Sequence, residues 1–453
     1  MKEKFLHRLF VLTFLFPGIV FSQGENNNWY FGGHAGVTFN TIPPSALLNL
    51  SMTALHCSSC VSDSLGVFLM ATNGWYIYDR NFQKMPNGSG IYGNANYTQG
   101  VIFVKKPGED SVYYLFSARK TEYPLPLNLG LYYSLIDLRL NNGLGDVVPG
   151  MKNIPINGGE IVNKRLQAIR HYNNKDVWIV TFDTLNRYLA YLVDVNGISN
   201  APVISQSALD ESVPLNNDGD LKLSQDGTKL ILMDPWDSMA EFCHFNDTTG
   251  VVTPLFTFCP IADSGFVSAR PAPDAEFSPD GKLLYLTAIF SPGDSLNICQ
   301  YETMYTNPDS FVQSQVIIGT DWFGSGLQLA SNGKIYQTRI PNDYLNVIHN
   351  PDVKGSGCNF EINGIWLKGR ASGDKLTSFL QVYKAYLHYK GNCQWDSIHF
   401  SGDIWPPADS IHWDFGDPGS GVANFSNDPT PTHIYSLPGQ YTVELFVRHM
   451  DNR

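Results

Sequence analysis

The sequence predicts an all-β protein, and three observations support this prediction. Aromatic residues make up 13% of the 453 residues, and charged residues make up only 16%, against about 25% in an average globular protein. The 40 glycines and 27 prolines indicate many turns. A turn with Asp or Asn before Gly also recurs between short apolar segments. Helical bundles, coiled coils and disordered chains need other compositions, so these classes are excluded.

The N-terminus has the pattern of a secretory signal. An apolar run over residues 9–21 follows Lys2, Lys4 and Arg8, as in the charged and apolar regions of a signal peptide. The run is shorter than the ~20 residues that a membrane helix needs. We therefore expect a signal peptide at residues 1–22, no membrane span, and a mature protein that is secreted or lies on the cell surface.

One unit recurs along the chain, and its copies are about 50 residues apart. The glycines of the clearest copies, Gly227, Gly281 and Gly333, are separated by 54 and 52 residues. We interpret each turn as a two-residue hairpin, because the centre of such a turn needs positive φ. The copies read Leu223-Ser-Gln-Asp-Gly-Thr-Lys-Leu-Ile-Leu232, Phe277-Ser-Pro-Asp-Gly-Lys-Leu-Leu-Tyr-Leu286 and Leu329-Ala-Ser-Asn-Gly-Lys-Ile-Tyr-Gln-Thr338.

Looser copies begin near Ser64, Ser111 and Lys175, and the resulting spacing is close to the ~40 to 50 residues of a propeller blade. A further sheet would form if the strand Trp29–Gly32 paired with Phe379–Tyr383, which would close the ring and remove its exposed edges. We predict a β-propeller of six to eight blades, with seven as the expected number, over residues 28–388.

Seven cysteines cannot all pair with one another. The segment Cys57-Ser-Ser-Cys60 has the spacing of a redox or metal motif, but no second pair or spaced histidines complete a zinc site. It is either inert or bridged locally. When the repeats are aligned, Cys243 and Cys299 share a position with Ile348, which predicts a buried apolar role for both cysteines.

A different pattern begins near residue 391. The motifs Trp413-Asp-Phe-Gly-Asp417 and His433-Ile-Tyr-Ser-Leu-Pro-Gly-Gln-Tyr441 resemble the PKD (polycystic kidney disease) domain, an Ig-like β-sandwich. The resemblance implies a sandwich over residues 391–453, with Trp413 and Phe415 in its core. Such a sandwich usually has one more strand, so we expect the sequence to be truncated at its C-terminus.

The rest of the chain is similar to secreted Bacteroidetes proteins that pair a WD-repeat-like propeller with PKD domains and often end in a gliding-motility-associated sorting domain for type IX secretion. This resemblance implies export and a role in adhesion or binding. The chain departs from it at Asp374-Lys-Leu-Thr-Ser-Phe379, where the family commonly reads Gly-Leu-Pro-Asn-Phe. The matching motifs are Asn28-Trp-Tyr-Phe-Gly32, Met85-Pro-Asn-Gly88, Tyr97-Thr-Gln-Gly100, Tyr113-Tyr-Leu-Phe116, Gly143-Leu-Gly-Asp146, Phe277-Ser-Pro-Asp-Gly281 and Leu327-Gln-Leu-Ala-Ser-Asn-Gly-Lys-Ile-Tyr336.

No catalytic residue, metal site or cofactor can be assigned from the sequence. The carboxyl pairs Asp210-Glu211 and Asp218/Asp220 could act as acid and base or hold a cation, but they are more simply a solvated loop. His244 and His349 lie at equivalent repeat positions, which favours packing on a strand face. A net charge of -12 without clustered Lys or Arg excludes nucleic acid as a partner.

Aromatic segments offer the better candidates for binding. Rings lie beside carboxylates in Trp75-Tyr-Ile-Tyr78, Asp234-Pro-Trp-Asp237 and Asp321-Trp-Phe323, and such rings can stack on sugars. They can equally be core residues between blades. We expect a non-enzymatic binding or adhesion protein whose partner is a surface protein or polysaccharide. The alternative is a surface hydrolase or lyase that acts on glycans.

Overall fold

The structure is a computed structural model. It describes residues 24–448 apart from 50, 94–98, 120–129, 160, 174, 210–218, 235–238, 261–273, 290–295, 322–323, 340–342, 381–383, 392–395, 406–407 and 409. The chain divides into two compact units, Ser22–Val382 and Tyr383–Arg453. The expected signal peptide lies outside the described residues and stays a prediction. Among the helices of the described part, none has the length and apolar character needed to cross a membrane.

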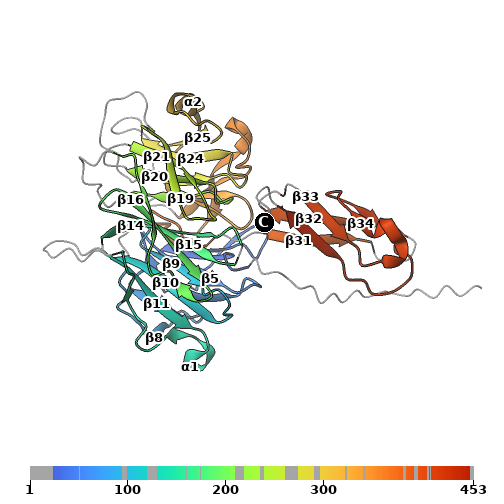
Figure 1. Ribbon diagram of the computed structural model, residues 1–453, viewed down its shortest axis with the longest axis horizontal. Helices are drawn as coiled ribbons and strands as arrows, with labels where there is room; N and C mark the ends of the chain where they lie inside the picture. Colours follow the sequence, from blue (N-terminus) through green and yellow to red (C-terminus); the bar gives the residue numbers. More distant parts are fainter. Residues whose placement is uncertain are drawn as a thin grey trace, which may run out of the picture. The chain divides into compact units, whose positions relative to one another are not determined.

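The first unit is built from antiparallel sheets that follow one another along the chain (Figure 1). In the described residues there are seven, with these members: β1 (Asn28–Gly33), β2 (Ala35–Thr38), β3 (Ser45–Ala46) and β4 (Thr53–Ala54); β5 (Ser59–Ser62), β6 (Phe68–Thr72), β7 (Tyr76–Tyr78) and β8 (Lys84–Ser89); β9 (Val101–Lys105), β10 (Val112–Arg119), β11 (Gly130–Asp137), β12 (Asp146–Val147) and β13 (Ile154–Pro155); β14 (Val162–Arg170), β15 (Val177–Asp183), β16 (Arg187–Asp194), β17 (Gly197–Ile198) and β18 (Val203–Gln206); β19 (Leu221–Leu223), β20 (Lys229–Asp234), β21 (Met239–Phe245) and β22 (Val252–Phe258); β23 (Ala275–Phe277), β24 (Leu283–Ile289), β25 (Leu296–Glu302) and β26 (Val316–Asp321); β27 (Gly324–Leu329), β28 (Ile335–Arg339), β29 (Tyr344–Ile348) and β30 (Phe360–Trp366). The short helices are α1 (Leu140–Gly143), α2 (Pro308–Gln313) and the 3-10 turn η1 (Gly355–Cys358).

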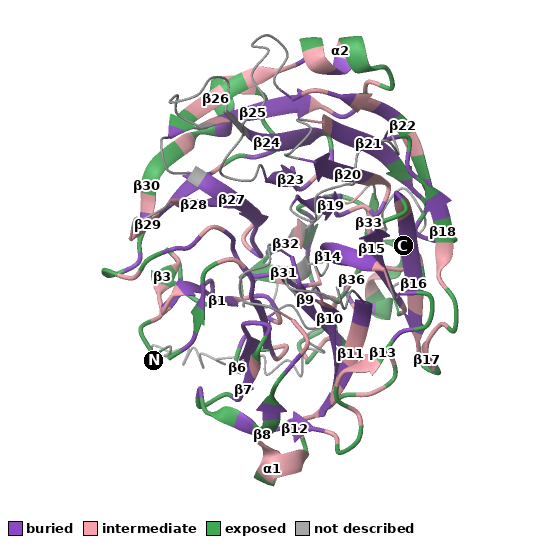
Figure 2. Ribbon diagram, turned by 90° about the vertical axis from the view of Figure 1, so that its left-hand side faces the viewer, coloured by how far each residue is buried: buried purple, intermediate pink, exposed green. Residues whose placement is uncertain are grey.

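These sheets form a ring, as the β-propeller prediction requires. The first strands of successive sheets, from β5 through β9, β14, β19 and β23 to β27, lie against one another in chain order. Figure 2 shows β9, β14, β19, β23 and β27 near the middle of the unit, with β8, β12, β22, β26 and β30 toward the rim. Each large hydrophobic cluster draws its residues from two adjacent sheets. Both faces of most sheets are therefore covered, which explains why strands such as β15 are buried along their whole length.

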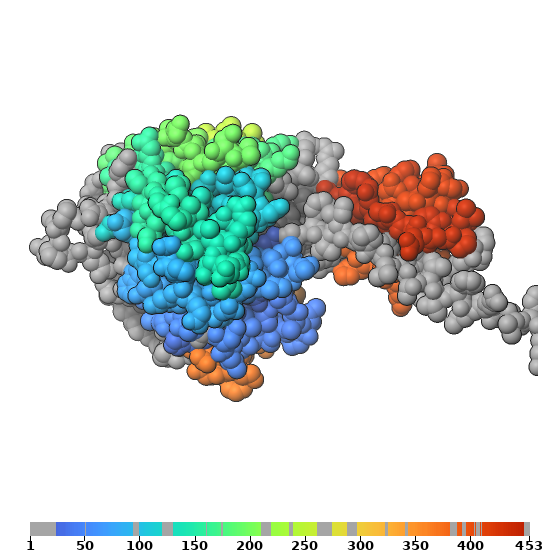
Figure 3. Space-filling view, turned by 90° about the horizontal axis from the view of Figure 1, so that it is seen from below, coloured from blue at the N-terminus to red at the C-terminus, as the bar shows by residue number. Residues whose placement is uncertain are grey.

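The ring is closed by residues 371–380, which we call the closing segment. The Gly33 N–H donates to Ala371 O at 2.9 Å, and the Ser378 N–H donates to Ser58 O at 2.8 Å. The Gly326 N–H, on β27, donates to Asp374 O at 2.9 Å. The beginning and end of the ring thus meet, and Figure 3 shows the blue first strands beside an orange segment from near residue 360, in agreement with the packing of β3 against β30.

Trp29–Gly32 was predicted to pair with Phe379–Tyr383, but it does not pair with the described part of that segment, residues 379–380. Strand β1 pairs with β2 and β4 and bridges to the closing segment only at Gly33–Ala371. Trp29 instead packs its ring against Phe379, with centroids 5.7 Å apart. Residues 381–383 lie outside the described residues, and the number of blades stays a prediction.

The repeated Asp-Gly turns are longer than predicted. The first hairpin closes where the Ser224 N–H donates to Lys229 O at 3.0 Å, so its loop has four residues and not two. Gly227 follows a turn in which its N–H donates to Ser224 O, and it has φ 66°. Positive φ at the glycine is therefore confirmed. The hydroxyl of Ser224 donates to Asp226 Oδ1 at 2.5 Å and stabilises the longer loop.

The cysteine alignment was wrong by two residues. Cys243 pairs with Leu230, and the corresponding partner of Leu284 is Tyr301, whereas Cys299 pairs with Leu286. A shift of two keeps a side chain on the same face of a strand. Both thiols are accordingly buried at 0% exposure in hydrophobic clusters, and the predicted apolar role is confirmed.

The second unit is a small sandwich of two three-stranded sheets, β31-β32-β35 and β34-β33-β36. Trp413 and Phe415 are at most 1% exposed and pack with Phe400, as the sequence predicted. The members are β31 (Lys384–Lys390), β32 (Ile398–Trp405), β33 (Ser410–Asp414), the 3-10 segment η2 (Pro418–Asn424), β34 (Phe425–Ser426), β35 (Thr432–His433) and β36 (Glu444–Arg448).

Candidate functional site

Five ionisable side chains meet near the middle of the ring, and we call them the central ion cluster. Asp220 and Lys222 come from the start of β19, and Asp274 and Glu276 from the start of β23. Residues two apart lie on the same face of a strand, so each strand directs two charged groups the same way. Lys375 of the closing segment supplies the fifth. All five are less than 10% exposed.

Asp274 binds the closing segment. Its Oδ2 lies 2.8 Å from Lys375 Nζ and accepts the Leu327 N–H at 2.9 Å, while its Oδ1 accepts the Ala275 N–H at 2.8 Å. Lys375 Nζ also lies 3.6 Å from Asp220 Oδ2. One lysine therefore holds carboxyl groups from two adjacent sheets.

Glu276 makes the equivalent set of contacts one step along β23. Its Oε2 lies 2.9 Å from Lys222 Nζ and accepts the Leu329 N–H at 2.7 Å. Lys222 also donates to Gln328 Oε1 at 3.1 Å. The first strands of three successive sheets are thus joined by side chains.

The ionisation of these groups follows from burial and from their neighbours. Burial and the negative charge of Asp274 raise the pKa of Asp220 far above its usual range, against the opposing effect of Lys375. Burial also raises the pKa of Asp274, but Lys375 and its hydrogen bonds outweigh this effect and leave the pKa lowered. Burial raises the pKa of Glu276 more than Lys222 lowers it. For Lys222 and Lys375 the nearby carboxylates outweigh burial and raise the pKa.

The cluster is poorly arranged for acid–base catalysis. Groups with strongly shifted pKa are candidates for function, but a catalytic acid or base must reach a substrate. Asp220 and Asp274 are 1% and 3% exposed, and the ammonium groups occupy the space in front of them. The geometry favours a structural role in ring closure.

Of the carboxyl candidates from the sequence, the structure describes only Asp220. Asp220 is buried, so its interpretation as a solvated loop residue was wrong, while Asp210, Glu211 and Asp218 lie outside the described residues. The sequence reasoning missed Lys222, Asp274, Glu276 and Lys375. A signal was present, because Asp274 and Glu276 follow Asp220 and Lys222 by the 54-residue repeat spacing.

The two histidines do not pack on a strand face as predicted. His244 is exposed on β21, so its side chain is directed to solvent. His349 Nε2 lies 2.6 Å from Glu361 Oε2, and its Nδ1 lies 2.9 Å from Lys334 Nζ. These contacts make His349 part of a surface polar group.

The aromatic candidates divide between surface and core. Trp75 is 44% exposed, whereas Ile77 and Tyr78 are buried. Asp321 is buried and forms an ion pair with Arg339, whose Nε–H donates to Oδ1 at 3.1 Å and to Oδ2 at 2.8 Å. Asp234 is also buried. The rings at positions 236, 322 and 323 lie outside the described residues.

Cys57 and Cys60 are buried free thiols in this structure. Burial raises the pKa of both to about 12. A thiolate is the reactive form of cysteine, so this environment favours the inert alternative for the pair. Cys60 Sγ accepts a hydrogen bond from Thr377 of the closing segment at 3.2 Å.

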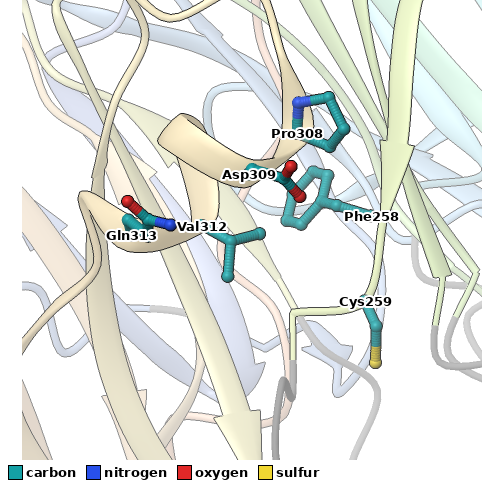
Figure 4. A pocket seen from close by; sticks show the side chains of 6 residues that line it. All are labelled: Phe258, Cys259, Pro308, Asp309, Val312 and Gln313. Carbon is teal, nitrogen blue, oxygen red and sulfur yellow. The ribbon is translucent and has the colours of Figure 1, made fainter.

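An open cleft of about 390 Å³ lies between the end of β22 and α2 (Figure 4). Its lining is mostly apolar, with the Asp309 carboxylate and the Gln313 amide at the margin, and Cys259 lies at one end. No cluster of titratable groups enters it among the described residues. The lining residues are Phe258, Cys259, Pro308, Asp309, Val312 and Gln313.

The sandwich buries a carboxyl group of its own. Asp417 Oδ1 accepts a hydrogen bond from Ser436 Oγ at 2.6 Å, and its Oδ2 accepts the Ser436 N–H at 2.8 Å and lies 3.2 Å from His433 Nε2. These residues belong to the two motifs that resemble the PKD domain. Residues 397–453 match the family model of the PKD domain. The match covers the sandwich from β32 onward.

The PKD domain carries a row of exposed rings on the outer face of its β34-β33-β36 sheet, which we call the aromatic row. His412 lies between Phe425 and Phe446, at centroid distances of 5.6 and 6.1 Å. The two phenylalanines are 48% and 53% exposed.

No curated protein matches the chain in sequence. Among solved structures, the chain is similar to a functionally unknown protein from Desulfotomaculum acetoxidans (9% identity, TM-score 0.38, covering 77% of this chain and 82% of that chain). It is also similar to a periplasmic gluconolactonase from Pseudomonas aeruginosa (9% identity, TM-score 0.35, 66% and 93%) and to Hsv2 from Kluyveromyces lactis (10% identity, TM-score 0.38, 72% and 90%). The propeller assignment rests on the order of the sheets.

Proposed function

We propose that this chain is an exported, non-enzymatic binding or adhesion protein. In this proposal the ring is the interaction platform and the PKD domain is a spacer or a second adhesive unit. The observation that carries the proposal is the central ion cluster, because the carboxyl groups gathered at the ring centre face lysines and are closed to solvent. Propeller enzymes place catalytic groups around that centre.

The aromatic row supports a binding role for the PKD domain. Aromatic residues are enriched where proteins bind partners, since they offer a large contact area at a low cost in side-chain entropy. A PKD domain is itself typical of extracellular proteins. The partner is a surface protein or a polysaccharide.

Export is supported by the N-terminal sequence pattern and by the resemblance to secreted Bacteroidetes proteins, which favours type IX secretion. N-terminal sequencing of protein recovered from the medium or the cell surface is expected to begin at Gln23. A mature chain that still starts at Met1 in the cytoplasm would contradict this part of the proposal.

The activity test is a glycan and protein array with the purified chain, together with a reducing-sugar release assay on the same polysaccharides. We expect binding without turnover. Turnover that is lost in Asp274→Asn would favour the glycan-acting hydrolase or lyase instead, because such enzymes use a pair of carboxyl groups.

The role of the PKD domain is tested with Phe446→Ser. If the domain is adhesive, this change is expected to weaken binding about tenfold, a usual effect for an aromatic contact residue. The matched control is Val422→Ser, because Val422 is 94% exposed in the same domain and lies outside the aromatic row. Equal binding by the unmodified chain, Phe446→Ser and Val422→Ser would indicate that the domain is a spacer.

A further inference from the structure

The central ion cluster holds more acids than bases. Asp220, Asp274 and Glu276 face Lys222 and Lys375, and two ammonium groups neutralise only two carboxylates. A third ionised carboxyl would leave an uncompensated buried charge, which is strongly unfavourable. One of the three acids is therefore expected to be neutral.

Hydrogen bonding identifies which acid is neutral. Asp274 and Glu276 each accept two main-chain N–H groups in addition to a lysine. Asp220 accepts only the Ala275 N–H, at 3.3 Å on Oδ2. Its Oδ1 is buried and accepts no hydrogen bond in the described structure. An ionised carboxylate needs donor partners on both oxygens, whereas a protonated carboxyl can itself donate. Asp274 lies beside Asp220 as an acceptor for that proton.

The other charged groups around Asp220 do not change this assignment. The guanidinium of Arg165, on β14, lies against Gly219 and donates to Met233 O at 3.0 Å, on the main chain of β20. Among the charged groups, Asp274, Lys375 and Lys222 have the largest effects on the pKa of Asp220. Asp374, the neighbour of Lys375 in the closing segment, pairs with His56. Gln99 binds the main chain of Leu221 and carries no charge.

We propose that Asp220 keeps its proton at neutral pH, and that this proton allows the closing segment to bind two sheets through Lys375. The cluster then acts as a proton-dependent latch at the ring centre. Loss of the proton places two adjacent carboxylates against one ammonium group, which weakens the hold of the closing segment on the ring.

The pH dependence has a definite sign. A native pKa above the unfolded value means that the folded state holds a proton that the unfolded chain has lost. The free energy of unfolding then falls as pH rises from the unfolded pKa, about 4 for Asp, up to the native pKa. In this window one retained proton changes the folding equilibrium constant tenfold per pH unit.

The test compares the full chain with Asp220→Asn in urea unfolding between pH 5 and pH 8. Asparagine has nearly the shape of the protonated acid and cannot ionise. We expect the folding equilibrium constant of Asp220→Asn, relative to that of the unmodified chain, to rise about tenfold per pH unit in this range. A ratio that stays constant with pH would overturn the proposal, whatever the stability of the variant at a single pH.

The matched control is Asp226→Asn, on the turn between β19 and β20 of the same sheet, because Asp226 pairs with Lys229 and not with the central ion cluster. The native pKa of Asp226 is lowered, so the stability of this variant relative to the unmodified chain should not vary between pH 5 and pH 8. If the variants fail to fold, infrared spectroscopy of the unmodified chain decides. A protonated-carboxyl stretch at pH 7 that disappears at higher pH while the fold persists supports the proposal, and the absence of such a band overturns it.

Discussion

The ring and the PKD domain each bury an aspartate, but the two aspartates are held in opposite ways. Burial raises the pKa of Asp417, yet hydrogen bonds from Ser436 and His433 outweigh it and leave the pKa lowered. Burial and a second carboxylate raise the pKa of Asp220. The difference is that Asp417 is surrounded by donors within one short stretch of chain, whereas Asp220 shares its lysine with Asp274. The supply of donors decides the charge of a buried acid.

The largest expected effect comes from removing the shared lysine. Lys375→Met is expected to lower the free energy of unfolding of the ring by about 3 to 5 kcal/mol, because it leaves a buried carboxylate without its partner. Urea unfolding followed by near-ultraviolet circular dichroism measures the loss. The control is Lys368→Met, which removes a lysine that is exposed and lies over the Trp366 ring. Equal losses in both variants would contradict the role of Lys375.

A smaller effect is expected in the PKD domain. Asp417→Asn should destabilise the domain by about 2 kcal/mol, the usual value for hydrogen bonds to a buried charged group. Because the native pKa is lowered, the contribution of Asp417 is present above the unfolded pKa and is lost as pH falls through the native one. The variant should therefore be less sensitive to acid, as thermal unfolding at pH 3 to 7 can show. Asp396→Asn, at an exposed position, is the control, and a similar flattening there would contradict this account.

The smallest effect is expected at Asp352, which forms a carboxyl pair with Asp280 on the surface of the ring. Asp352 Oδ1 accepts the Asp280 N–H at 2.9 Å, and burial together with Asp280 raises the pKa of Asp352 to about 6. Its contribution is present below about pH 4 and is lost as pH rises through about 6. Asp352→Asn should remove this slope, with a change of at most about 1 kcal/mol because solvent screens an exposed group. Thermal unfolding from pH 4 to 7 measures it, and an unchanged slope would disprove it.

Much of the architecture follows from local patterns. Each Asp-Gly turn fixes a hairpin, and the alternation of apolar residues around it fixes the strands. The PKD motifs are also local patterns that predict structure. Trp413, Asp417 and His433 lie within about 20 residues of one another in the sequence and close together in the domain. The loop length at Gly227 was missed because the serine hydroxyl that extends the turn gives no hydrophobic signal.

The centre of the ring was not predicted because its contacts join distant residues of unlike type. Lys375 lies about 100 residues or more from both aspartates in the sequence. Nothing beside it in the sequence indicates Asp274 or Asp220 as its partners. Asp220 looked solvated because it follows a polar stretch. Burial of a charge depends on which sheets surround it, and a single sequence carries that information only through the repeat spacing.

The closing segment also gives the protein a late step in folding. Asn26 Nδ2 donates to Leu380 O across 354 residues, and joining chain positions so far apart costs about 5 kcal/mol in loop entropy. Contacts of such high sequence separation form slowly. The sheets can assemble one after another from local hairpins, but the ring is complete only when Lys375 reaches the two aspartates, so closure and opening are expected to set the folding and unfolding rates of the whole unit.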